Sequence, residues 1–194
     1  MTRALIRTLP WHEERYARAG ELLAELHVQG VQVALVEDST RDAMDTFEQA
    51  LDLQGDDDCW HFEDDVVLTS HWARKARALE LANRGRIVQA WSRRQDDLTV
   101  GSRRQPGSTF ISTLCFYVPG LLAPALRAYS TDWRRDWTRE TSKYSKPFTD
   151  ILIADFLKQA GLTYWLHVPS LVQHVDVKST LGNPAGRVSL TFVP

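Results

Sequence analysis

Three consecutive carboxylates interrupt an apolar segment in the middle of the chain. Residues 59–68 read Cys-Trp-His-Phe-Glu-Asp-Asp-Val-Val-Leu, and the acids are Glu63, Asp64 and Asp65. Burying uncompensated carboxylates is very unfavourable, so a core position needs a neutralising cation. Mg²⁺ and Mn²⁺ prefer oxygen ligands and commonly bridge to phosphates. The pattern therefore favours a cation site at a strand end, with a solvated acidic turn as the alternative.

The spacing of the three acids also predicts where they point. In a regular strand, alternation places Glu63 and Asp65 on one face and Asp64 on the other. The nearby run Asp56-Asp57-Asp58 follows Gly55 and is interpreted as a solvated loop. In open α/β sheets ligands bind beyond the carboxyl ends of strands, which is where we expect the triplet.

Strands and helices are expected to alternate along the chain. Apolar, β-branched runs predict strands at 5–8, 31–36, 59–68, 87–91, 110–118, 164–168 and 188–193. Apolar spacings of three and four, with caps at Ser39 or Thr40 and at Thr149, predict helices at 12–26, 41–53, 70–82, 121–129 and 150–159. The order predicts an α/β sandwich with a mainly parallel central sheet, in one domain over residues 1–194.

Composition narrows the class of protein. The 194 residues carry 23 Lys and Arg against 25 Asp and Glu, a net charge of −2, so no obligatory polyanionic partner is indicated. Cys59 and Cys115 lie in apolar segments and are expected to be buried free thiols. No apolar leader or membrane-length run is present, and a cytoplasmic protein is expected.

Two segments resemble glycosyltransferases of the GT-A fold, a Rossmann-like α/β/α sandwich. Phe62-Glu63-Asp64-Asp65-Val66 looks like their DxD-type motif, often written Glu-Asp-Asp. About a hundred residues later, Pro-Ser-Leu-Val-Gln-His at 169–174 begins a segment similar to one found in several such enzymes. That segment has Asp176 where glycine is usual and Thr180 where a serine is usual.

The resemblance implies a transferase that uses a nucleotide-sugar donor, most simply a UDP-sugar, with Mn²⁺ or Mg²⁺. It implies Asp65 and His174 as metal ligands, although a histidine at this position can also be purely structural. It implies donor contacts from the remaining matching positions: Glu63 and Asp64 to the ribose or sugar, Lys178 and Ser179 to the diphosphate, Thr8 and Arg15 to the nucleotide, and Asp38 to the base. Helix capping is an alternative role for Asp38.

Asp150 is the candidate general base. An inverting transfer needs a carboxylate to take the proton of the acceptor hydroxyl, and related inverting enzymes place an acid before a comparable helix. Asp150 precedes the helix predicted at 150–159, and Asp155 is a weaker candidate. The helix dipole alone also favours Asp in a first turn, which is the alternative explanation.

The acceptor is expected at two segments, a long loop at 92–108 and a loop with some helix at 130–146. Arginine grips phosphate and tryptophan stacks on sugars or bases, so the acceptor could be a glycan or a hydroxymethylated base in DNA. The relevant side chains are Arg93, Arg94, Arg103, Arg104, Arg134, Arg135 and Arg139 with Trp91, Trp133 and Trp137. A metal-dependent phosphohydrolase or nuclease, and a non-catalytic nucleotide-binding module, are the alternative functions.

Overall fold

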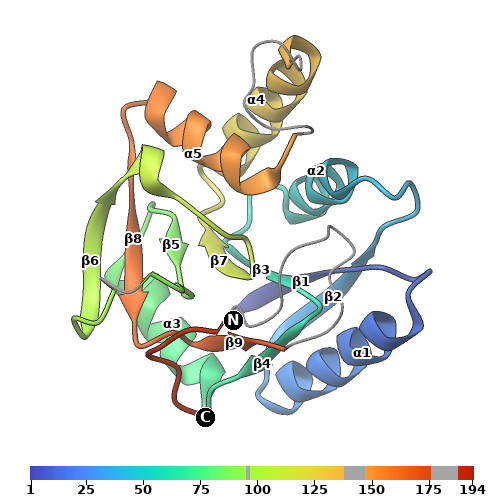
Figure 1. The fold of residues 1–194 in the computed structure, drawn as a ribbon, viewed down its shortest axis with the longest axis vertical. Helices are drawn as coiled ribbons and strands as arrows, with labels where there is room; N and C mark the ends of the chain where they lie inside the picture. Colours follow the sequence, from blue (N-terminus) through green and yellow to red (C-terminus); the bar gives the residue numbers. More distant parts are fainter. Residues whose placement is uncertain (95–96, 138–146, 176–187) are drawn as a thin grey trace.

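A mixed sheet of seven strands forms the centre of the computed structural model. The structure describes residues 1–94, 97–137, 147–175 and 188–194 (Figure 1). The strand order is β2-β1-β3-β7-β5-β8-β6. The strands are β1 (Arg3–Thr8), β2 (Gln32–Glu37), β3 (Cys59–Glu63), β5 (Val88–Gln89), β6 (Gly101–Pro106), β7 (Cys115–Val118) and β8 (Thr163–Val168). Two further strands, β4 (Val66–Leu68) and β9 (Val172–His174), form a separate antiparallel pair.

Most strands of the sheet run in one direction. β1 is parallel to β2 and β3, and β5 is parallel to β8. β7 is antiparallel to β3 and β5, and β6 is antiparallel to β8. The start of β7 therefore lies beside the end of β3, with Cys115 opposite Phe62. We refer to the side of the sheet where β1, β2 and β3 end as the carboxyl edge.

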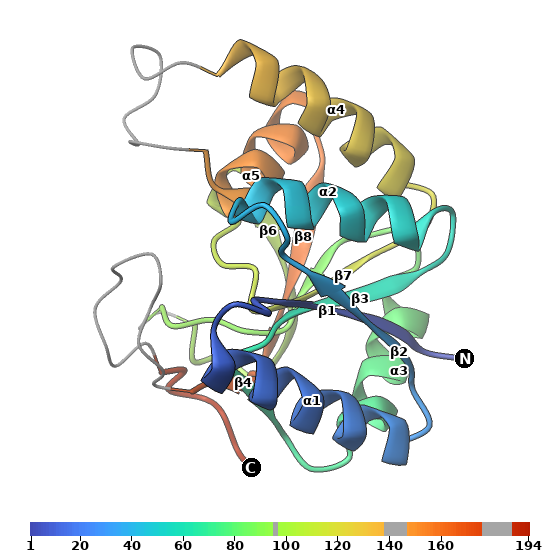
Figure 2. The same ribbon diagram turned by 90° about the vertical axis from the view of Figure 1, so that its right-hand side faces the viewer.

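Helices cover both faces of the sheet (Figure 2). α1 (Glu13–Val28) and α3 (Trp72–Ala82) pack on one face, where Trp60 and Trp72 meet edge to face. α2 (Ala43–Gln54), α4 (Ala123–Asp136) and α5 (Thr149–Gln159) pack on the other, around Phe47 and Phe116. The predicted α/β, Rossmann-like sandwich with a mainly parallel sheet is therefore confirmed. Cys59 and Cys115 are buried free thiols, also as predicted.

Several predicted boundaries were wrong for identifiable reasons. α2 begins after Asp42, whose carboxylate accepts the backbone N–H of Met44, so neither Ser39 nor Thr40 is the cap. The N-cap of α5 is Phe148 rather than Thr149. Residues 188–194 contain no strand, and the strand predicted at 110–118 begins only at Cys115. Within the described ranges, no helix has the length and apolar character needed to cross a membrane.

Candidate functional site

Asp64 lies at the break between β3 and β4 and is fully buried. The Nε of Arg15, in the first turn of α1, donates to Asp64 Oδ1 at 2.6 Å, and a second guanidinium nitrogen also pairs with this oxygen. The backbone N–H of Leu9 donates to Asp64 Oδ2 at 3.2 Å. The end of β1 and the start of α1 thus neutralise the most deeply buried acid of the triplet.

Asp65 contacts both Arg15 and His174. Its Oδ2 lies 3.2 Å from a guanidinium nitrogen of Arg15 and 3.4 Å from Nε2 of His174. The pairing of β4 with β9 places Val66 opposite His174, and the N–H of Val175 donates to the carbonyl of Asp65 at 2.8 Å. The mid-chain acid and the late histidine, predicted to meet, are therefore in contact.

The expected alternation of the triplet does not continue through the break. Asp64 and Asp65 both reach Arg15 rather than pointing to opposite faces. The reason is that the chain leaves the main sheet after Glu63 and enters β4, which pairs only with β9. Alternation holds only while a strand stays regular.

The pKa values of the two buried aspartates are shifted in opposite directions. Burial raises the pKa of Asp64 to about 6, because Arg15 only partly compensates for the lost solvation. Burial also disfavours ionised Asp65, but hydrogen bonding to His174 and the charge of Arg15 outweigh it, so the pKa of Asp65 is lowered. Asp65 is therefore the carboxylate that stays ionised over the wider pH range.

Glu63 is held from the sheet side by two residues. Its Oε1 accepts the hydroxyl of Thr113 and lies 3.6 Å from a guanidinium nitrogen of Arg7. Arg7 is buried against the rings of Phe47 and Phe116, and it donates to the Thr113 carbonyl at 2.9 Å. The sequence reasoning missed Arg7 and Thr113. A charged residue in the apolar run Ala4-Leu5-Ile6-Arg7 was the available signal, since such a residue needs an internal partner.

Thr8 and Asp38 lie together at the carboxyl edge. Both are buried, and the N–H of Asp38 donates to the Thr8 carbonyl at 2.8 Å. Asp38 Oδ1 accepts the backbone N–H groups of Thr40 at 3.1 Å and Asp42 at 3.2 Å. Asp38 therefore orders the turn that leads into α2. This role is similar to helix capping, the alternative predicted for Asp38, although the N-cap of α2 itself is Asp42.

Asp150 lies in the first turn of α5, and a short connection links it to Glu63. Its Oδ2 accepts the backbone N–H of Ser112 at 3.3 Å, and the neighbouring Thr113 holds Glu63. Ser112 adopts a left-handed conformation with φ 79°, which a non-glycine residue seldom adopts. Asp155, the weaker candidate base, accepts from Tyr129 at 2.9 Å and Trp133 at 3.0 Å, and so connects α4 with α5.

The predicted acceptor loops are partly regular structure. Residues 101–106 form strand β6, so the long loop expected at 92–108 was wrong there. α4 extends to Asp136, which agrees with the expectation of some helix in 130–146. Described arginines bind neighbouring parts of the chain: Arg94 the Thr109 carbonyl, Arg103 Asp97, Arg104 Thr163, and Arg134 Asp42 and Asp45. Arg139, Lys178 and Ser179 lie outside the described residues.

Asp65 and His174 have the chemistry of a divalent-cation site. Asp65 Oδ1 is buried and has no hydrogen-bond partner among the described residues, and carboxylate oxygen suits Mg²⁺ and Mn²⁺. Over residues 1–94, 97–137, 147–175 and 188–194, no group of three or more His, Cys, Asp or Glu side chains could hold a metal ion. The described chain thus offers two ligands, and Mg²⁺-type ions usually complete their shell with water and substrate phosphates.

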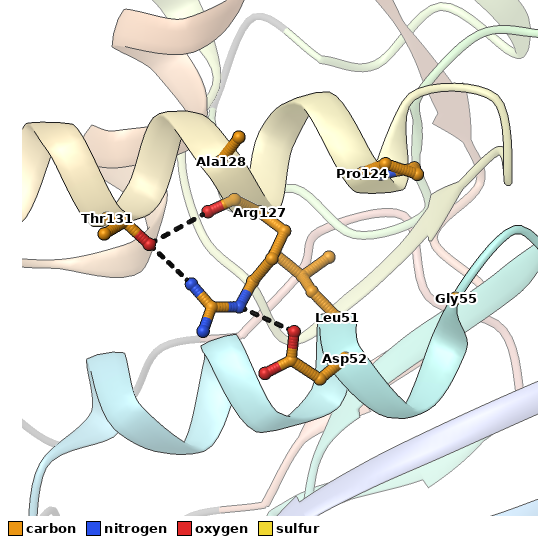
Figure 3. A pocket seen from close by; sticks show the side chains of 7 residues that line it. All are labelled: Leu51, Asp52, Gly55, Pro124, Arg127, Ala128 and Thr131. Carbon is orange, nitrogen blue, oxygen red and sulfur yellow. Dashed lines mark hydrogen bonds and ion pairs between the residues drawn. The ribbon is translucent and has the colours of Figure 1, made fainter.

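A separate hollow of about 360 Å³ lies between α2 and α4 (Figure 3). Arg127 crosses it, donating to Asp52 at 2.8 Å and Thr131 at 2.7 Å. None of the predicted metal, donor or catalytic residues lines this hollow, and only Thr131 among its lining residues falls in a predicted acceptor segment, 130–146. The hollow is therefore not the place where the acid cluster would receive a ligand.

Comparisons with known proteins give no family assignment. No protein-family model matches the sequence, and no curated protein matches it. Among solved structures, the chain is similar to a putative glucose-1-phosphate thymidylyltransferase from Bacillus anthracis in complex with a sucrose. The similarity has a TM-score of 0.45 and 8% sequence identity, over 90% of this chain and 89% of that chain. Function must therefore be argued from the side chains of this protein.

Proposed function

We propose that this protein is a metal-dependent glycosyltransferase of the GT-A type that takes a nucleotide-sugar donor, most simply a UDP-sugar. The observation that carries the proposal is the approach of His174 Nε2 to within 3.4 Å of Asp65 Oδ2, across 109 positions of sequence (174 − 65). Asp65 Oδ1, which has no hydrogen-bond partner among the residues that the structure describes, supports it, because a buried carboxylate oxygen without a donor is a position for a cation.

Asp65 and His174 would hold Mn²⁺ or Mg²⁺, which stabilises the negative charge that develops on a departing diphosphate. Arg15 keeps Asp64 and Asp65 in place and leaves Asp65 Oδ1 available. Glu63, half-buried and fixed through one oxygen by Thr113, can accept a hydrogen bond from a ribose or sugar hydroxyl through the other. Thr8 and Asp38 are the proposed nucleotide contacts at the ends of β1 and β2.

Asp150 is the proposed general base for the acceptor hydroxyl. The Ser112 and Ile151 N–H groups fix its two oxygens on the carboxyl edge, so its orientation is set before substrate arrives. Lys178 and Ser179 are proposed to contact the diphosphate. The acceptor, a glycan or a modified base in nucleic acid, is proposed to lie against segment 92–108, which contains arginines, and segment 130–146, which contains arginines and tryptophans.

Thermal unfolding with a panel of UDP-, GDP- and CMP-sugars, with and without Mn²⁺, tests the proposal. Binding to the folded state raises stability by RT ln(1 + [L]/Kd), so a donor at 100 times its Kd adds about 2.7 kcal/mol. The rise should require Mn²⁺ and should vanish in Asp65→Asn and His174→Ala. Asp56→Asn is the matched control, because Asp56 is an exposed acid in the loop before β3.

The outcomes separate the candidate functions. A metal-dependent rise that survives Asp65→Asn would contradict the metal site. Degradation of polynucleotide without any sugar donor would instead support a nuclease, and a nucleotide effect that ignores Mn²⁺ would support a plain binding module.

A further inference from the structure

The side chain of Gln173 ties the strand that carries His174 to the C-terminal residues 188–194. Its Nε2 donates to the Ser189 carbonyl at 3.2 Å, and its Oε1 accepts the Ser189 N–H at 2.8 Å. The same Oε1 accepts the backbone N–H of His174 at 3.2 Å. One carboxamide therefore fixes both a buried C-terminal residue and the backbone of the histidine.

Hydroxyl groups hold the C-terminal residues in the same place. Ser170 Oγ and Ser189 Oγ lie 2.7 Å apart, and the Ser170 N–H donates to Thr191 Oγ1 at 3.2 Å. Thr69, directly after β4, donates to the Val193 carbonyl at 2.7 Å. Ser170 and Ser189 are both buried, so these contacts are shielded from water. The C-terminal residues thus form a fixed support beside β4 and β9.

The β4–β9 pair needs such a support. It has three residues in each strand, and a two-stranded pair is only marginally stable by itself. β4 holds His174 from one side through the pairing of Val66 with His174. Gln173 holds the other side, because its carboxamide connects β9 to Ser189.

We infer that Gln173 is a positioning residue for the Asp65–His174 pair and that it sets the affinity of this pair for a divalent cation. This inference rests on the proposed function, since it takes the pair as a metal site. Groups that orient a metal ligand change metal affinity by about 10- to 100-fold when they are removed. Gln173 acts on the backbone of His174 rather than on its ring, so we expect a loss of about tenfold.

Titration with Mn²⁺ alone, followed by the electron paramagnetic resonance signal of the free ion, tests the inference. Gln173→Ala should raise the Kd for Mn²⁺ about tenfold at a temperature where circular dichroism shows the variant folded. Ser189→Ala should change the Kd much less, because it keeps the backbone groups that meet Gln173. Gln159→Ala, an exposed glutamine at the end of α5, is the neutral control.

A second readout separates positioning from stability. Hydrogen exchange at the His174 amide should be faster in Gln173→Ala, because this amide loses its acceptor. If that variant fails to fold, Gln173→Asn gives the same comparison, because it keeps the carboxamide on a side chain that is one methylene shorter. Equal Mn²⁺ affinity in wild type and Gln173→Ala overturns the role of Gln173 alone. A wild type that binds no Mn²⁺ overturns the metal site as well, and the two failures are thereby distinguished.

Discussion

Replacement of Arg15 by methionine should destabilise the protein strongly at pH 8. Arg15 is the shared partner of two carboxylates, and the side chains of Asp64, Asp65 and Arg15 are 0%, 9% and 11% exposed. Methionine keeps much of the volume and removes the charge, which leaves two buried acids without their cation. Removing one partner of a buried ion pair costs about 3–5 kcal/mol, and we expect a loss in that range.

The loss should shrink as the pH falls. Burial holds the folded-state pKa of Asp64 at about 6, above its unfolded value of about 3.9. Protonated Asp64 therefore favours the folded state at low pH, and this contribution disappears as the pH rises through 6. Without Arg15 the folded pKa of Asp64 rises further, and each unit adds about 1.4 kcal/mol to the loss at pH 8. Asp65, whose pKa is lowered, is still ionised at pH 5, so part of the destabilisation caused by Arg15→Met should remain at that pH.

Urea unfolding at pH 8 and pH 5, in the presence of a chelator, measures the loss of stability in Arg15→Met and its dependence on pH. Arg135→Met is the control, because Arg135 is 66% exposed and its ion pairs with Asp132 and Asp136 are solvated. Such exposed pairs contribute about 0–1 kcal/mol. A loss below 1 kcal/mol for Arg15→Met at pH 8, or a loss that stays constant down to pH 5, would refute the reasoning.

Three further changes have defined outcomes. His61 is buried and its pKa is lowered to about 3, against about 6.5 in the unfolded chain, so lowering the pH to 5 should reduce the free energy of unfolding by about 2 kcal/mol. Urea unfolding of His61→Phe should lack this part of the pH dependence, and an unchanged dependence of stability on pH would contradict the prediction. Gly120→Ala should lower stability by at least about 2 kcal/mol, because its Cβ would lie 1.9 Å from the Asp56 carbonyl oxygen. Gly20→Ala in α1, where no atom lies within 4 Å of the added Cβ, should raise stability by about 0.5–1 kcal/mol, and similar melting temperatures of the two variants would count against both predictions. Asp155→Ala should lower stability by about 1–3 kcal/mol through the lost contacts with Tyr129 and Trp133, yet leave any Mn²⁺-dependent donor effect intact; loss of that effect would make Asp155 functional.

The periodic elements could be predicted because their apolar residues repeat at helical or strand spacing. Ala19, Leu22 and Leu26 bury one face of α1, and Phe47, Ala50 and Leu51 do the same for α2. Strand β6 could not be predicted in this way. Its sequence, Gly-Ser-Arg-Arg-Gln-Pro, has no apolar alternation, and it forms a strand because β8 offers it a free edge.

The site was predictable in its acids and in His174, but not in the residues that hold them. Asp65 and His174 carry recognisable chemistry, and their meeting was expected from a family resemblance rather than from spacing. Arg7 and Thr113 come from β1 and from the connection before β7, and only the antiparallel placement of β7 brings Thr113 to Glu63. Such tertiary neighbours leave no local pattern. The interpretation of Lys178 and Ser179 stays a prediction.

The composition of β6 has a consequence for how the protein behaves at high concentration. An outermost strand presents unpaired backbone groups that can template the addition of a strand from another copy. On β6, Arg104 puts positive charge at this border, and Pro106 removes one N–H donor. Two copies approaching along β6 would meet like charges and an interrupted ladder. The polar sequence that gave β6 no strand signal thus protects the sheet from growing into aggregates.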